Sequence, residues 1–416
     1  MRRKLLALIA IAALAAAGWY VLQSLTEQPQ PVRSTPVVRG VPRDLPDTPD
    51  EWRGRIDYRA LDLQLIRLSL RPEMAGLAVA VIEDGEVSFV RTYGVVDRDS
   101  RIPVTPETHF RWASASKTVT GMLAAQLSEE KLLDLDRPVS SWQTSLHLPG
   151  DAEKRVTLAQ LLAHQTGLTK NAFDEKLEDG ERPDVLRAGL AAAPLQCEPG
   201  TCHTYQNIAF DAASEILAEA GQAPFADAVQ AKLFRPLGMT SATYGMNGLT
   251  GAQDWARPHR NSEVRTLNEA YWRVPAAAGV NSNIVDFALW MQASMGARFG
   301  ILSAKVIQVA QAPRVDTHRL YSGALAQSIT GSQYGLGWRS FAYASHRLVG
   351  HSGAVDGYRA TMIFEPATKT GVVAMWNSNW GIPFRIPFAV LDSYYKQADA
   401  NWFDLSDIPL PPPDTP

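Results

Sequence analysis

The order of β-rich and helical segments along this 416-residue chain restricts its fold more than any other feature. Two β-rich runs, 76–83 and 87–96, lie early in the chain and flank Asp84-Gly85, a dipeptide typical of hairpins. β-rich runs return only after residue 333, and most segments in between have helical periodicity. Strands at both ends around a helical middle predict an α+β fold, in which the two ends build one sheet and the middle packs over it.

The segments after the first two strands have the following predicted bounds. The later strands are predicted at 334–341, 347–349, 358–364 and 371–376. Helices are predicted at 56–70, 112–128, 158–163, 185–193, 209–218, 225–234, 284–295 and 383–396.

The charge of the chain argues against nucleic-acid binding, and its length makes a stabilising metal or disulfide unnecessary. The formal net charge is −3, and three basic residues, Arg2, Arg3 and Lys4, stand at the extreme N-terminus. The rest of the chain is therefore mildly acidic and has no electrostatic reason to bind nucleic acid. A chain of this length buries enough surface to fold without a metal or disulfide staple. No cofactor and no metal are predicted.

The N-terminal segment 1–22 reads as a targeting segment, because three basic residues precede an uncharged run from Leu5 to Leu22. One interpretation is a secretory signal cleaved after Ala15-x-Ala17. The other is an uncleaved anchor, since these 18 residues reach the ~17–25 that span a bilayer. Trp19 and Tyr20 favour the anchor, because aromatic residues suit the membrane interface.

Both interpretations place the body of the protein outside the cytoplasm. The anchor would hold it at the inner membrane with the body in the periplasm, whereas cleavage would give a soluble periplasmic or secreted protein. Six prolines in 23–50 indicate an extended linker, and 408–416 is a similar proline-rich tail. We therefore expect one folded body over 51–407.

The two cysteines, Cys197 and Cys202, are expected to form a disulfide, the usual state of paired cysteines in an exported protein. Pro199-Gly200 lies between them and suits a type II turn that would bring the two ends together. A zinc site using the adjacent His203 is the alternative, but the local sequence lacks the further ligands that zinc needs.

Ser114-Ala115-Ser116-Lys117 forms an S-x-x-K pattern within a predicted helix. Residues three apart lie on one face of a helix, so the lysine amine can reach the serine hydroxyl and accept its proton. The pattern also occurs at Ser128–Lys131, between acidic residues that favour a protonated lysine, and at Ser393–Lys396, near the end of the last helix. We interpret these two as solvated helix faces.

The surroundings of Ser114 distinguish it from the other matches. The segment 110–120, FRWASASKTVT, closely resembles the nucleophile segment of class C β-lactamases and their relatives, the serine DD-peptidases and β-lactamase-like esterases. Tyr205-Gln206-Asn207 resembles the Y-x-N element of this superfamily, and His351-Ser352-Gly353 resembles its third element, written K-T-G in lactamases and often H-x-G in peptidases and esterases. Stretches 161–168, 234–239 and 334–338 also resemble the family, so the resemblance covers about 60–395 in the family's order.

The resemblance implies a β-lactamase/transpeptidase-like fold with an antiparallel sheet, and it implies roles for named residues. Ser114 would be the nucleophile of an acyl-enzyme, and Lys117 and Tyr205 would share the proton transfers, with either as the general base. Asn207 would orient the substrate or Lys117. The remaining implied residues are His351, Ser352 and Gly353 for substrate binding, and the backbone N–H groups of Ser114 and Ala354 for the oxyanion hole.

Two further sequence features receive structural interpretations. The literal Lys369-Thr370-Gly371 follows Glu365-Pro366-Ala367 and precedes an apolar run, so we expect it in a hairpin turn rather than in the site. His164 is expected to be a buried, hydrogen-bonded structural residue.

The expected function is hydrolysis of an ester or an amide/peptide bond in a small-molecule or peptide substrate, of esterase or DD-peptidase type. His351 favours this over a β-lactamase, because only about a quarter of histidine side chains with the reference pKa are charged at pH 7, whereas lactamases carry a lysine there. A β-lactamase and a catalytically inactive penicillin-binding-like module are the alternatives. The sequence makes no prediction of oligomeric state.

Overall fold

The structure of the protein is a computed structural model, and it describes residues 54–298, 300–317, 323–398, 400–405 and 408. The predicted targeting segment 1–22, the linker 23–50 and all of the tail except Ile408 lie outside the described residues. Within the described ranges, no helix combines the length and the apolar character needed to cross a membrane.

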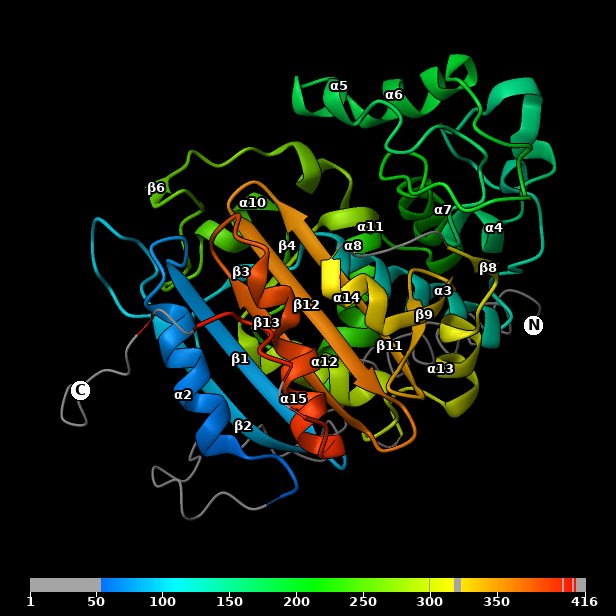
Figure 1. The fold of residues 1–416 in the computed structure, drawn as a ribbon. Helices are drawn as coiled ribbons and strands as arrows, with labels where there is room; N and C mark the ends of the chain where they lie inside the picture. Colours follow the sequence, from blue (N-terminus) through cyan, green and yellow to red (C-terminus); the bar gives the residue numbers. More distant parts are fainter. Residues whose placement is uncertain (1–53, 299, 318–322, 399, 406–407, 409–416) are drawn as a thin grey trace, which may run out of the picture. The chain divides into compact units, whose positions relative to one another are not determined.

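An eight-stranded antiparallel sheet forms the centre of the body, in the order β2-β1-β13-β12-β11-β10-β9-β8 (Figure 1). Strand β1 lies between its hairpin partner β2 and the late strand β13, with Leu77 opposite Trp376. This pairing confirms the prediction that both ends of the body build one sheet. The strands are β1 Gly76–Glu83, β2 Glu86–Gly94, β8 Val315–Asp316, β9 Ile329–Tyr334, β10 Arg339–Tyr343, β11 His346–Val355, β12 Tyr358–Glu365 and β13 Thr370–Trp376.

Helices cover both faces of the sheet, which is why all eight residues of β1 are buried. Leu77, Val79 and Val81 join the apolar cluster formed with α2 (Tyr58–Ser69) and α15 (Ile386–Tyr395), the first and last of the described helices. The alternate residues of β1 join the larger cluster formed with the middle helices. A strand buried on both faces has no polar alternation, as its apolar sequence indicates.

The middle region is mainly helical, as predicted, with two small sheets that the sequence did not indicate. Its helices are α3 Lys117–Glu129, α4 Leu158–Leu162, α5 Asp174–Glu178, α6 Pro183–Gly189, α7 Ala212–Gly221, α8 Phe225–Val229, α9 Arg235–Leu237, α10 Gly245–Thr250, α11 Pro275–Ala278, α12 Ile284–Ser294, α13 Ala304–Gln311 and α14 Gly323–Ser328. The small sheets contain β3 Phe110–Arg111, β4 Thr243–Tyr244 and β7 Val280–Ser282, and separately β5 His259–Arg260 and β6 Glu263–Val264.

The predicted strand 334–341 is wrong, because the chain turns between β9 and β10 instead of continuing. Gly337 has φ 72°, a left-handed conformation that favours glycine, and its N–H donates to the carbonyl of Leu162. A Cβ at position 337 would lie 2.1 Å from the carbonyl oxygen of Lys117. Gly337 thus lets this turn pack directly against the start of α3, whereas Gly335 allows its close approach to the carbonyls of Ala310 and Ala312.

Candidate active site

Ser114 lies in a short 3₁₀ turn, η2 (Ala113–Ser116), which leads directly into α3. The preceding Ala113 has φ 48°, an uncommon left-handed conformation for a residue with a side chain. Trp112 is fully buried and anchors the turn through a 2.8 Å hydrogen bond from its indole N–H to the hydroxyl of Ser282. The nucleophile candidate is therefore presented by a tightly held turn at the start of a helix.

Lys117 is fully buried, and its amine lies 3.4 Å from the hydroxyl of Ser114. The amine also donates to the side-chain oxygen of Asn207 at 2.7 Å and to the carbonyl of Ala277 at 3.1 Å. Both of these partners accept only. In its deprotonated form the amine would have two N–H groups and one lone pair, so the two carbonyl oxygens would take the hydrogens and the lone pair would face the hydroxyl of Ser114.

Tyr205 follows the disulfide-bonded segment and lies over the same amine. The Lys117 amine is 4.7 Å from the centre of the Tyr205 ring, within the range of a cation–π contact. The ring of His351 lies 6.3 Å from that of Tyr205. The S-x-x-K element and the Y-x-N element are far apart in sequence, and they come together at the amine of Lys117.

The third element, His351-Ser352-Gly353, lies in the middle of β11, which passes directly beside η2. A Cβ at position 353 would lie 2.0 Å from the carbonyl oxygen of Trp112 and 2.9 Å from the backbone nitrogen of Ser114. Only glycine permits this approach. Ser352 exchanges a 2.9 Å hydrogen bond with Thr361, and Ala354 is exposed at the cavity. The oxyanion hole of Ser114 and Ala354 stays a prediction.

Hydrogen bonds fix the proton positions on two buried histidines. The backbone N–H of Gln206 donates to Nδ1 of His164 at 3.1 Å, so the neutral ring carries its proton on Nε2, which donates to the hydroxyl of Tyr334 at 3.2 Å. That hydroxyl in turn donates to Nε2 of His351 at 2.8 Å. Nδ1–H of His351 then donates to the carbonyl of Ser352 at 2.7 Å.

These hydrogen bonds require both histidine rings to be neutral. Burial, and then the positive charges of Arg339 and Lys117, hold the pKa of His351 well below its usual value of 6.5. Burial likewise lowers the pKa of His164. His351 therefore lines the site as a neutral, hydrogen-bonded ring and brings no positive charge. His164 holds it in place through hydrogen bonds to and from the hydroxyl of Tyr334.

One cavity of about 500 Å³ collects the predicted site residues. Lys117 lies beneath its surface, bonded to Ser114 and Asn207. The lining residues are Ser114, Lys170, Asn171, Asp174, Gln196, His203, Thr204, Tyr205, Asn207, Tyr271, Ala278, Arg339, His351, Ser352, Gly353, Ala354, Val355 and Phe384.

Arg339 is a cavity residue that sequence reasoning missed. It is the first residue of β10, and its guanidinium carbon lies 5.0 Å from the ring of Tyr334 and 5.5 Å from that of Tyr205. Among the described residues, no carboxylate lies within salt-bridge distance of it, and its Nη1 is buried without a hydrogen bond. Arg339 directly follows the family-like stretch 334–338, which is the one sequence signal that could have drawn attention to it.

The other pattern matches lie outside this cavity. Lys369 has φ 53° in the turn between β12 and β13, and it lines a different hollow of about 880 Å³. Ser393 accepts a hydrogen bond from the backbone N–H of Asp57, and neither Ser393 nor Ser128 lines the cavity that contains Ser114.

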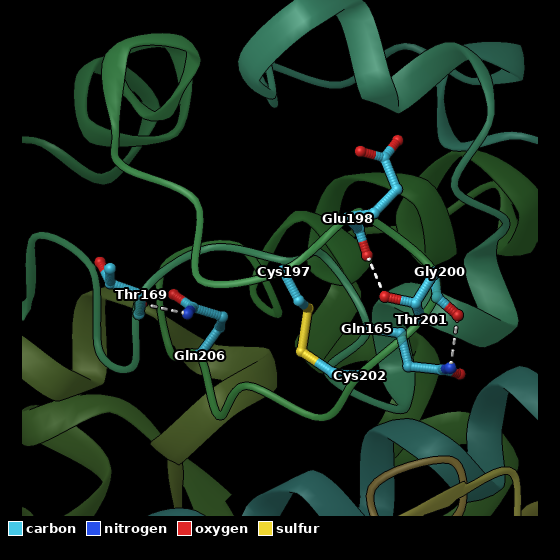
Figure 2. Close-up of a disulfide and its surroundings, with 8 residues drawn as sticks. All are labelled: Gln165, Thr169, Cys197, Glu198, Gly200, Thr201, Cys202 and Gln206. Atoms are coloured by element: carbon cyan, nitrogen blue, oxygen red, sulfur yellow. Dashed lines mark hydrogen bonds between the residues drawn. A yellow bond between two sulfur atoms is a disulfide. The ribbon is translucent and has the colours of Figure 1, made fainter.

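The predicted disulfide between Cys197 and Cys202 is confirmed (Figure 2). Both sulfurs are therefore bonded to each other and are not available as zinc ligands. The enclosed turn is held against a neighbouring loop, since Gly200 N–H donates to the carbonyl of Gln165 at 2.7 Å and the Gln165 amide donates to the carbonyl of Gly200 at 3.0 Å. In the described part of the chain, no group of three or more metal-ligating side chains is arranged to hold a metal.

Loss of this disulfide is expected to lower kcat more than it lowers Tm. The chain-entropy model gives roughly 2 kcal/mol for so short a loop, and the Pro-Gly turn already restricts the unfolded chain. Tyr205, however, lies only three residues after Cys202, and catalytic geometry tolerates small displacements poorly. The comparison is between wild type and Cys197→Ser with Cys202→Ser, by ester hydrolysis and thermal unfolding. An unchanged kcat with a sharply lower Tm would show a purely structural staple.

The sequence of this chain is similar to those of known proteins of the beta-lactamase family. The family model described as "Beta-lactamase" matches residues 66–387. Unguisins hydrolase ungD of Aspergillus violaceofuscus is 26% identical over 341 residues, covering 74% of this chain and 59% of that protein. Protein flp of Staphylococcus aureus is 22% identical over 311 residues, covering 73% and 60%. The chain thus spans about 60% of the length of these curated relatives.

Solved structures show the same fold. An octameric penicillin-binding protein homologue from Pyrococcus abyssi superposes with a TM-score of 0.72 at 23% identity, covering 82% of this chain and 78% of the other. A class C beta-lactamase mutant superposes with a TM-score of 0.66 at 22% identity, covering 81% and 97%.

Proposed function

The chain belongs to the beta-lactamase family of serine hydrolases, and from this premise we propose that it cleaves an amide or peptide bond next to a substrate carboxylate. The reaction would run through an acyl-enzyme on Ser114, as in a DD-peptidase. The single observation that carries the proposal is Arg339, a cavity guanidinium without a carboxylate partner among the described residues.

In the proposed acylation step, the hydroxyl oxygen of Ser114 attacks the substrate carbonyl, and its proton passes to the lone pair of Lys117. The amine that leaves then takes a proton from the Lys117–Tyr205 pair, and an ester bond to Ser114 remains. Water hydrolyses this ester by the same transfers in reverse. The geometry favours Lys117 as the first acceptor, because Asn207 and Ala277 aim its lone pair at Ser114.

Charge in the cavity favours an anionic substrate. His351 is neutral, so it does not replace the lysine that lactamases carry at the third element. Arg339 supplies a permanent positive charge beside Tyr205 and Tyr334 instead. The guanidinium has no carboxylate partner among the described residues, and a substrate carboxylate in the cavity would supply one.

Arg339→Gln tests the carboxylate preference. We expect kcat/KM for a D-Ala-D-Ala peptide to fall about 10–100-fold, the equivalent of one charged hydrogen bond. The same peptide with an amidated C-terminus should be affected much less. Arg347→Gln is the control, since Arg347 bonds the carbonyl of Gln311 away from the catalytic cavity. Equal losses on both peptides would contradict carboxylate recognition by Arg339.

A β-lactamase is the second candidate, because penicillins and cephalosporins also carry a carboxylate that Arg339 could bind. The two functions differ in the fate of the acyl-enzyme. Rapid turnover of a chromogenic cephalosporin would support a β-lactamase. Stable labelling by a fluorescent penicillin without turnover would support a peptidase.

We further propose that the body works outside the cytoplasm. The disulfide between Cys197 and Cys202 supports this location, because such bonds persist in oxidising compartments. Attachment to the inner membrane through 1–22 is proposed from the sequence of that segment.

A further inference from the structure

Asp174 is a buried carboxylate that lines the catalytic cavity and has no part in the mechanism described so far. It is the first residue of α5, is 8% exposed, and accepts a 2.6 Å hydrogen bond from the side-chain amide of Asn207. Asn207 accepts from Lys117 at 2.7 Å through the other end of the same amide. Three buried side chains from distant parts of the sequence thus connect a carboxylate to the lysine beside Ser114.

The hydrogen bonds of Asp174 lead almost exclusively to Asn207. The hydroxyl of Tyr271 lies 3.3 Å from the same carboxylate oxygen but 2.8 Å from Glu178, and its single proton goes to the closer acceptor. The second oxygen of Asp174 is buried without a hydrogen bond. If Asp174 only capped its helix, it would not need a hydrogen bond to Asn207. The observed bond therefore indicates a role that involves Asn207.

The orientation of the Asn207 amide decides where the lone pair of Lys117 points. With its oxygen toward Lys117, Asn207 accepts one N–H and leaves the lone pair for Ser114. With the amide reversed, its NH₂ would face the amine and compete with Ser114 for that lone pair. A carboxylate accepts hydrogen bonds and donates none, so an ionised Asp174 holds the NH₂ end on its own side.

We propose that Asp174 is a positioning residue that fixes the Asn207 amide and so aims the lone pair of Lys117 at Ser114. This deepens the proposed function and rests on it, because it concerns activation of the same nucleophile. No covalent step is added: Asp174 neither touches the substrate nor receives the proton of Ser114.

The proposal gives a pH dependence. Burial raises the pKa of Asp174 from 3.8 to about 6, against the opposing effects of Asn207 and the positive charge of Lys117. The other titratable groups that face it are Tyr271 and Glu178. Below pH 6 the carboxyl gains a proton and becomes a donor, so it no longer excludes the reversed amide. Activity is therefore expected to fall as the pH drops through about 6.

The raised pKa also has a consequence for stability. A folded-state pKa above the unfolded value means that the folded protein binds the proton more tightly, so the ionised group costs stability above pH 6. Asp174→Asn keeps the shape and removes this charge. Its Tm at pH 8 should consequently not fall, whereas loss of a structural cap would lower it.

The experiment compares Asp174→Asn with Glu178→Gln, a control one turn later on the same helix that bonds Tyr271 but not Asn207. The rate of labelling by a fluorophosphonate probe and kcat for a short-chain p-nitrophenyl ester are measured from pH 5 to 9, together with Tm. For Asp174→Asn we expect both rates at pH 8 to fall ~10–100-fold, with KM little changed and the fall near pH 6 lost. Glu178→Gln should keep the wild-type rates and profile.

Wild-type rates and a retained fall near pH 6 in Asp174→Asn would overturn the proposal. Asp174→Ser, which shortens the side chain and removes the charge, should repeat the loss and serves if the first variant folds poorly. Ser114→Ala, measured in parallel, separates the two proposals. Labelling that persists without Ser114 refutes the nucleophile, whereas labelling that requires Ser114 but ignores Asp174 refutes only the positioning role.

Discussion

Ser114→Ala is expected to abolish ester and peptide hydrolysis and to eliminate covalent labelling by a fluorescent penicillin. Loss of the nucleophile of a serine hydrolase costs on the order of 10⁶-fold in kcat, because Lys117 and the oxyanion donors then have no hydroxyl to act on. The folded structure should remain, since Ser114 is only partly buried and, within the described part of the chain, its hydroxyl bonds only the Lys117 amine. Hydrolysis rates, gel fluorescence after labelling and Tm give the three measurements.

The chain offers two matched controls for this prediction. Ser128→Ala and Ser393→Ala remove the serines of the other two S-x-x-K patterns, and both should keep wild-type activity and labelling. Labelling that survives in Ser114→Ala but is lost in either control would assign the nucleophile elsewhere.

Arg187→Ala is expected to lower the free energy of unfolding by about 3–5 kcal/mol, the usual cost of removing one partner from a buried ion pair. Arg187 on α6 bonds Asp211 at 2.7 Å and Glu215 at 2.6 Å, and both Arg187 and Asp211 are buried. Asp211 also accepts a 2.9 Å bond from the backbone N–H of Ala276, next to the carbonyl that holds Lys117. The substitution therefore leaves a buried carboxylate without its counter-charge.

Urea unfolding at pH 8 measures this effect, because burial raises the pKa of Asp211 to about 7 and the group is mostly ionised at pH 8. Arg182→Ala is the control. It breaks an ion pair with Asp184 at the start of the same helix, where the arginine is 75% exposed, and such exposed pairs contribute little to stability. Similar losses in both variants would contradict the role given to the buried network.

The sequence predicted the sheet well where local pattern and tertiary environment agree. Strand β1 has the predicted bounds, because an apolar β-rich run followed by Asp84-Gly85 leaves few alternatives. The predicted strand 347–349 covers only the first part of β11, which continues through His351-Ser352-Gly353 to Val355. Those residues remain in the strand because η2 and β12 hold them there, which local preference does not reveal.

Only those site residues that belong to recognisable sequence motifs could be predicted. Ser114, Tyr205 and His351 were found through neighbouring residues that resemble a family, and the structure brings them into one cavity. Arg339 follows the family-like stretch 334–338 without belonging to it, and Asp174 has no such neighbours. The importance of both residues depends on what they face after folding. The charge of His351 was also beyond the sequence, because its neutral state follows from burial and from the hydroxyl of Tyr334.

The pairing of β1 with β13 has a consequence for biosynthesis. Ribosomes release the chain from its N-terminus, so the hairpin of β1 and β2 emerges long before the partner strand that carries Trp376. Until then one edge of β1 has no partner, and long-range pairing of this kind is intrinsically slow to form. The body can complete its sheet only after nearly all of it has been synthesised.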